Sequence, residues 1–167
     1  MILSNAESLI NHVRDLIKVQ CILEEIRNAE FKEEKISILS EHKDNDYLQN
    51  VIVYTYNPSI NYGDDVVNNI INLNETDTLD DIYSLWYMLS KLAMHNNDKA
   101  INQEFKDYMA FFPDINDLIT GIITKDLDLG IDLMSIREAF NSLGVYSIDH
   151  ELSNEHKVIN FFEYKHR

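Results

Sequence analysis

The stretch TKDLDLGID, residues 124–132, places Asp126, Asp128 and Gly130 at alternate positions. Such spacing occurs at the start of calcium-binding loops, because Ca²⁺ is held by carboxylate and other oxygen ligands. An EF-hand loop also needs an oxygen ligand at its fifth position and a bidentate glutamate at its twelfth. Here those two positions hold Gly130 and Arg137. The stretch therefore favours a turn between two helices over a calcium site.

Other residues that could perform chemistry do not form a recognisable site. The segment HELSNEH (150–156) places its two histidines six residues apart, which is about 120° round a helix and too far for one metal ion. Four glycines spread along the chain cannot form a phosphate-binding loop. The sequence therefore predicts no metal, no cofactor and no catalytic site within this chain. Whether the chain is part of a larger enzyme is left open.

Composition indicates one acidic domain. The chain has 167 residues, of which 45% are hydrophobic, and its 14 Lys and Arg face 29 Asp and Glu, for a net charge of −15. No apolar run reaches the roughly 18 residues that a membrane span needs, and no basic signal segment opens the chain. The single cysteine, Cys21, is expected to be buried beside apolar neighbours in a reducing compartment. These features predict a cytoplasmic protein without a membrane partner.

Positive charge is absent from a long stretch of the sequence. No Lys or Arg occurs between Lys43 and Lys91. Eight carboxylates lie in that interval: Asp44, Asp46, Asp64, Asp65, Glu75, Asp77, Asp80 and Asp81. Such a stretch repels nucleic acid and could present an acidic face to a basic partner.

Hydrophobic periodicity predicts helices along nearly the whole chain. The expected helices span residues 5–17, 19–28, 31–41, 45–55, 79–93, 98–110, 113–125 and about 132–143. Asp44 and Asp98 are the expected caps of two of them, and Gly130 is expected to end the helix that Pro113 opens. The tail, 145–167, is predicted to form a short strand or to be loosely structured. The fold class is therefore all-α, a single compact multi-helix domain with a less regular tail.

Three motifs in this order resemble the N-terminal α-helical DNA-binding domain of ATP-dependent DNA ligases, especially the phage type. ISILSEHKDNDYLQNVIVYTY (36–56) is similar to the family's KDNxxLxxVxxxTY segment. NNDKAI (96–101) is similar to the polar start of a later helix, and KDLDLG (125–130) to the family's turn between helices. The resemblance covers residues 18–144. It makes residues 1–17 an N-terminal helical extension and 145–167 a tail.

The resemblance implies a non-catalytic module that binds nicked or duplex DNA in replication and repair, as a fragment or subunit of a ligase. Contacts of this kind go mostly to phosphate and sugar. The candidate phosphate contacts are Lys32, Lys35, Lys43, Lys91, Lys99 and Lys125. The ligase motif Lys-x-Asp-Gly is incomplete, because Lys165 is followed by His-Arg and not by Asp-Gly. Adenylation would therefore come from a separate catalytic subunit.

Several positions depart from the family pattern and weaken the expected affinity for DNA. Asp128 stands where many ligases have arginine, and Asp64 and Asp65 stand where lysines are common. Each lost phosphate contact removes one released counterion from the driving force for binding. An alternative hypothesis is an acidic phage-type interaction or inhibitor protein that keeps the ligase-domain fold. Such a protein would bind a basic protein partner through the eight carboxylates above, as a mimic of DNA.

Overall fold

The computed structural model describes residues 6–64, 66 and 83–141, and within these ranges the chain folds into α-helices joined by short connections. In chain order the elements are α1 (Ala6–Asn28), α2 (Lys32–Glu41), α3 (Asp46–Tyr56), α5 (Leu85–Met94), α6 (Lys99–Phe111), the 3-10 helix η2 (Pro113–Ile115), α7 (Asn116–Ile123) and α8 (Leu133–Asn141). The predicted all-α class is confirmed for these residues. The tail beyond residue 141, and with it any strand there, lies outside the described residues.

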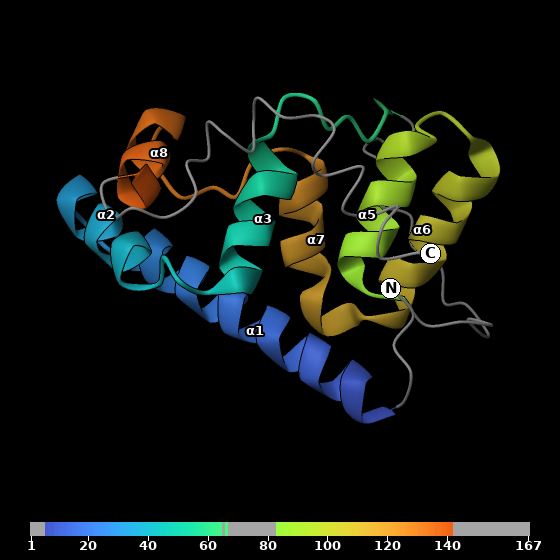
Figure 1. Ribbon diagram of the computed structural model, residues 1–167, viewed down its shortest axis with the longest axis horizontal. Coiled ribbons are helices and arrows are strands. Elements are labelled where there is room, and N and C mark those ends of the chain that lie inside the picture. Colours follow the sequence, from blue (N-terminus) through green and yellow to red (C-terminus); the bar gives the residue numbers. More distant parts are fainter. Residues whose placement is uncertain (1–5, 65, 67–82, 142–167) are drawn as a thin grey trace.

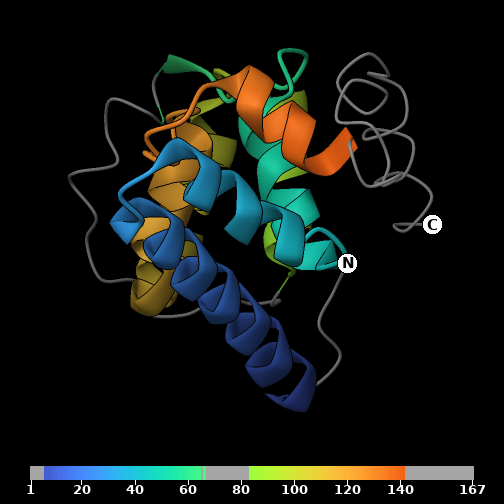
Figure 2. The same ribbon diagram turned by 90° about the vertical axis from the view of Figure 1, so that its left-hand side faces the viewer.

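Helix α1 runs along one edge of the molecule, and the other helices lie to one side of it (Figure 1). Helices α3 and α7 pack against each other, and α1 contacts α3 and η2. Helices α5 and α6 form a second pair, and α2 and α8 form a third at the far end of α1 (Figures 1 and 2). The junction between α7 and α8 therefore passes close to the C-terminal end of α1.

Helix α1 is continuous over 23 residues and includes, from Ala6 onward, both segments with predicted helical periodicity, 5–17 and 19–28. Its inward stripe includes Leu16, Val19, Leu23 and Ile26, each 0% exposed. No glycine or proline interrupts residues 6–28, so nothing in the chain forces a break.

Cys21 is exposed, which corrects the expectation that it would be buried. It lies two residues after Val19 and two before Leu23, which places it about 160° round the helix from both. Residues that are adjacent in sequence on a helix do not share a face, so the apolar neighbours were a misleading guide.

The helix caps follow the sequence at some ends and differ at others. Asp98 caps α6 by accepting hydrogen bonds from the backbone N–H groups of Ala100 and Ile101, as predicted. Helix α3 is capped by Asn45, whose side chain accepts from Leu48 N–H at 3.0 Å, and not by Asp44. Both residue types are good caps, so sequence preference alone could not separate two adjacent positions.

Helix α7 ends at Ile123, before the predicted end at Lys125 and well before Gly130. Lys125 adopts a left-handed backbone conformation with a φ of 63°. Its N–H donates to the Ile122 carbonyl, and Asp126 N–H donates to the Gly121 carbonyl. These two bonds form a Schellman motif, in which glycine is the usual left-handed residue. The prediction from Gly130 was wrong because a lysine takes that position here.

The helix predicted over 79–93 begins only at Leu85, because Ser84 is its cap and Tyr83 precedes the helix, so the predicted start was too early at these two residues. Leu85, Leu89 and Leu92 are fully buried. Trp86 is partly buried and stacks on Tyr54 at 5.5 Å between ring centroids, which agrees with the expected core role of its aromatic ring. Residues 79–82 lie outside the described residues.

Candidate functional site

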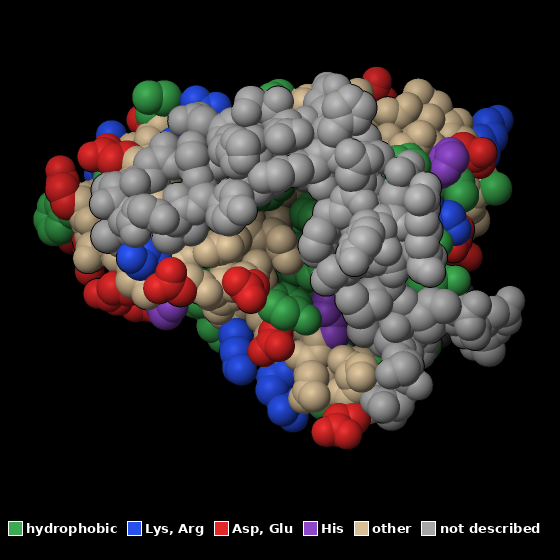
Figure 3. Space-filling view, viewed as in Figure 1, with side chains coloured by type: hydrophobic (Ala, Val, Ile, Leu, Met, Phe, Trp, Pro, Cys, Tyr) green, Lys and Arg blue, Asp and Glu red, His purple; other side chains and the backbone are tan. Residues whose placement is uncertain are grey.

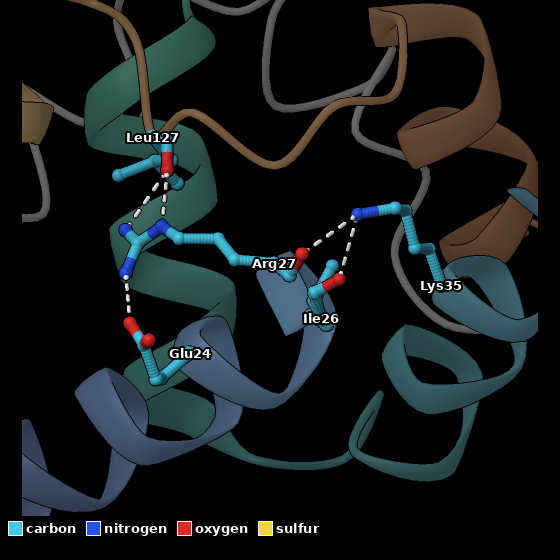
Figure 4. A network of polar contacts seen from close by, with 5 residues as sticks. All are labelled: Glu24, Ile26, Arg27, Lys35 and Leu127. Carbon is cyan, nitrogen blue, oxygen red and sulfur yellow. Dashed lines mark hydrogen bonds and ion pairs between the residues drawn. The ribbon is translucent and has the colours of Figure 1, made fainter. Parts of the chain in front are cut away.

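Lys35, one of the predicted phosphate contacts, is buried at 8% exposure. Its ammonium donates hydrogen bonds to the carbonyls of Ile26 at 2.8 Å, Arg27 at 3.3 Å and Leu129 at 3.0 Å. Figure 4 shows the side chain reaching from α2 to the last turn of α1. A lysine ammonium has three donors, and three carbonyls accept from it here. A cation beside these end-of-helix carbonyls also meets the negative end of the helix dipole.

Lys125 has a similar role at the end of α3. Its ammonium donates to the carbonyl of Asn57, the C-cap residue of that helix, at 2.8 Å. The ammonium also lies 5.3 Å from the ring centre of Tyr62, a cation–π distance. Burial lowers the pKa of Lys125 to about 8. The contacts of its side chain with Asn57 and Tyr62 therefore help to hold Lys125 in its left-handed backbone conformation.

Arg27 is a third cation turned toward backbone, and the sequence analysis did not single it out. Its Nε and Nη2 donate to the Leu127 carbonyl at 3.1 and 2.9 Å, and its Nη1 pairs with Glu24 at 3.3 Å (Figure 4). Tyr56 contributes from α3, because its hydroxyl accepts from Leu127 N–H at 3.3 Å.

These contacts define the junction loop, residues 124–132. Arg27 and Lys35 hold its carbonyls, while Lys125 extends from it to the end of α3. Asp126 accepts from the backbone N–H of Asp128 within the loop, and Asp132 caps α8 by accepting from Ser135 N–H at 2.7 Å. Among the described residues no group of His, Cys, Asp and Glu is arranged to hold a metal ion. The loop is therefore a structural junction that locks α1, α2, α3 and α7 together.

Two other predicted DNA contacts form ion pairs. Lys91 on α5 meets both oxygens of Glu104 on α6, at 2.7 and 2.9 Å. Burial lowers the pKa of Lys91, but the hydrogen bond and the charge of Glu104 have a larger opposite effect. The pKa of Lys91 is therefore raised. Lys32 lies 3.7 Å from Asp132 in a solvent-exposed pair. Hydrogen bonds from Ser135, and then the charge of Lys32, lower the pKa of Asp132.

Lys43 and Lys99 complete the predicted set. Lys43 is half-buried in the turn that follows α2, and Lys99 is exposed at the first position of α6. The six lysines come from five separate segments. The structure brings Lys35 and Lys125 to the junction loop but turns both ammonium groups toward backbone oxygen.

Exposed carboxylates gather instead on and around α2. We define the α2 acidic surface as Glu30, Glu33, Glu34, Glu41, Asp44 and Asp46, all of which are exposed. Residues 30–46 contain only three lysines, and one of them is the buried Lys35. Figure 3 shows red side chains clustered where α2 lies in Figure 1. Phe31, at the start of α2, is 63% exposed within this surface.

The predicted acidic face is only partly described. Asp44, Asp46 and Asp64 are exposed, as a partner-binding face requires. The other five predicted carboxylates lie outside the described residues: Asp65, Glu75, Asp77, Asp80 and Asp81. Four further members of an acidic surface were not predicted from the sequence: Glu30, Glu33, Glu34 and Glu41. The small number of Lys and Arg among them was a signal that could have indicated such a surface.

His12 is a buried titratable residue that the sequence analysis also missed. It is 5% exposed, and its Nε2 accepts from Leu85 N–H at 3.0 Å. Nε2 must therefore carry the lone pair, so Nδ1 carries the hydrogen and donates to the Tyr47 hydroxyl at 2.8 Å. Burial lowers the pKa of His12 to about 4. The neutral ring connects α1 to the first residue of α5 and plays a structural role.

Among the described helices, none is both long and apolar enough to cross a membrane. Comparison with protein-family models, with curated proteins and with solved structures gives no match. The resemblance to ligase DNA-binding domains therefore rests on the three sequence motifs alone.

Proposed function

We propose that the chain is a non-catalytic interaction module that binds a basic protein partner through the α2 acidic surface. One observation carries the proposal: the carboxylates of residues 30–46 face solvent, while Arg27, Lys35 and Lys125 turn toward backbone carbonyls. Two of the six predicted phosphate contacts, Lys35 and Lys125, are thus turned into the fold, whereas Lys32 and Lys99 stay exposed. The surface potential of this region is accordingly negative, which attracts a basic partner and repels nucleic acid.

Phe31 adds an exposed apolar side chain to the surface at the N-terminal end of α2. An aromatic side chain surrounded by charge is a common anchor in protein interfaces, because its burial contributes affinity while the charges select the partner. We therefore expect the partner segment to carry Lys or Arg around an apolar residue.

A charge-reversed variant tests this proposal. Glu33→Lys with Glu34→Lys alters two carboxylates in the first turn of α2. The matched control is Asp114→Lys with Asp117→Lys, two exposed carboxylates in the first turns of η2 and α7. Both variants change the net charge equally and lose similar helix-dipole stabilisation.

The assay is fluorescence anisotropy with a labelled lysine-rich peptide that carries a central leucine. We expect the α2 variant to weaken binding roughly tenfold and the control to change it roughly twofold or less. Equal effects of the two variants would mean attraction by net charge alone and would reject the α2 acidic surface as the site.

Ligase-type DNA binding is the second candidate function. The observation that favours it is the junction loop, because the segment resembling the ligase turn is a firmly held connection between two helices. A labelled nicked duplex in the same assay tests it. Salt-sensitive binding that Lys43→Glu and Lys99→Glu weaken would support DNA binding, whereas no binding at low salt would eliminate it.

A further inference from the structure

The outward side of α1 carries an apolar stripe formed by Ile10, Ile17 and Cys21. Ile10 is 54% and Ile17 is 37% exposed, and Cys21 is exposed as well. Spacings of seven and four residues place the three side chains within about 40° of one another round the helix. The buried stripe that includes Val19 lies on the opposite side of the same helix. The apolar residues on the outward side therefore do not belong to the core that the described residues form.

Charged residues of both signs lie beside this stripe along the helix. Arg14 and Lys18 lie toward its N-terminal half, and Glu24 and Glu25 lie toward its C-terminal end, all of them exposed. On a helical projection Arg14, Lys18 and Glu25 fall on the same flank of the stripe, together with the exposed Glu7 near the N-terminus of α1. Figure 3 shows Lys and Arg side chains along the lower edge of the molecule, where α1 runs in Figure 1. This flank therefore carries basic residues in its middle and an acidic residue toward each end.

We propose that α1 pairs in an antiparallel manner with α1 of a second copy of this chain. A two-fold axis between Ile17 and Cys21 places Ile17 of each copy against Cys21 of the other. The same axis brings Arg14 opposite Glu25 of the partner subunit, and symmetry repeats this ion pair. In antiparallel helices, like flanks face each other, so Arg14 of one copy meets Glu25 on the same flank of the other.

The size of this contact sets its expected strength. Overlap of residues 10–28 extends over about 28 Å. A single helix pair of this length buries less than the roughly 1,200 Å² of a standard stable interface. The dimer should therefore be reversible and populated as the concentration rises. None of its paired residues belongs to the α2 acidic surface, so the two proposals stand or fall separately.

Sedimentation equilibrium of the full chain over a roughly hundredfold concentration range tests the dimer. Arg14→Glu or Glu25→Arg alone should weaken dimerisation roughly tenfold, because each makes two symmetric contacts repulsive. The double variant restores both pairs with the charges exchanged and should dimerise about as well as the wild type. An equimolar mixture of the two single variants should also associate, since each supplies the charge that the other lacks.

Lys99→Glu, an exposed change on α6, is the control for net charge, and circular dichroism verifies the fold of every variant. Ile17→Ser should weaken dimerisation in all charge backgrounds. A wild-type chain that stays monomeric over the whole range overturns the proposal. So does a double variant that is as weak as the single ones, because the charges would then not face each other.

Discussion

His12 should make the stability of this protein fall between pH 7 and pH 5. In the folded state the pKa of His12 is lowered to about 4 by burial, while an unfolded histidine has a pKa of about 6.5. The unfolded chain therefore binds a proton in a pH range where the folded chain does not. The stabilisation is complete above pH 6.5 and is lost as the pH falls toward 4.

The magnitude follows from the two pKa values. Between pH 8 and pH 5 the linkage relation gives a loss of about 2 kcal/mol in the free energy of unfolding, and the full difference approaches about 3 kcal/mol below pH 4. Most carboxylates stay ionised down to pH 5, so this interval isolates histidine. A protonated ring would also lose the bond from Leu85 N–H, because Nε2 could no longer accept.

Urea denaturation at several pH values measures the free energy of unfolding. Unfolding is monitored by circular dichroism and by the fluorescence of Trp86, the only tryptophan. Its ring centre lies 6.2 Å from that of His12, so it reports on this region. His12→Gln keeps an acceptor near Leu85 N–H but does not titrate. We expect it to be less stable at pH 8 and to lose most of the slope between pH 8 and pH 5.

His42→Gln is the matched control, because it removes another histidine without changing the buried one. It should keep the wild-type slope. A wild-type free energy of unfolding that is flat over this range would refute the reasoning, and so would a slope that survives unchanged in His12→Gln.

Two further predictions concern the lysines at the junction loop. Lys35→Met should lower the free energy of unfolding by about 2–3 kcal/mol in urea denaturation, because three carbonyls lose their donor, whereas Lys99→Met at the surface should change it by less than about 0.5 kcal/mol. An equal effect of both changes would contradict the structural role of Lys35. Since burial lowers the pKa of Lys125, its side-chain methylene resonances should titrate near pH 8 in NMR spectra, well below those of other lysines. A midpoint above 10 would mean that burial does not disfavour the charged form of this ammonium.

The sequence was a good guide to the helices and a poor one to what joins them. Leu85, Leu89 and Leu92 form a regular apolar stripe, and Asp98 is a strong local cap, so both helices follow from short-range patterns. The end of α7 could not be predicted in this way. A lysine adopts the left-handed position that glycine usually takes, and its stabilising contact with Asn57 lies 68 residues away along the chain.

Contacts between residues far apart in the sequence also explain why Lys35, a predicted DNA contact, lies inside the fold. Lys35 contacts Leu129 across 94 residues, and Arg27 contacts Leu127 across 100 residues. No local pattern reveals such a partner. One readable signal existed, because Lys35 lies four residues before the buried Leu39 and three before the buried Ile38, on the apolar face of α2. A lone lysine on a buried face indicates a backbone or carboxylate partner more often than a surface contact.

These contacts link the fold to the surface that the protein presents. The chain has only 14 Lys and Arg against 29 Asp and Glu. Arg27, Lys35 and Lys125 each satisfy carbonyls at helix ends or in the junction loop, so their charge is used to close the fold. The exposed carboxylates around α2 are consequently left with few neutralising neighbours. Because cationic side chains bind the carbonyls at the helix ends, fewer of them remain to neutralise the α2 acidic surface. We expect this surface to bind the basic partner.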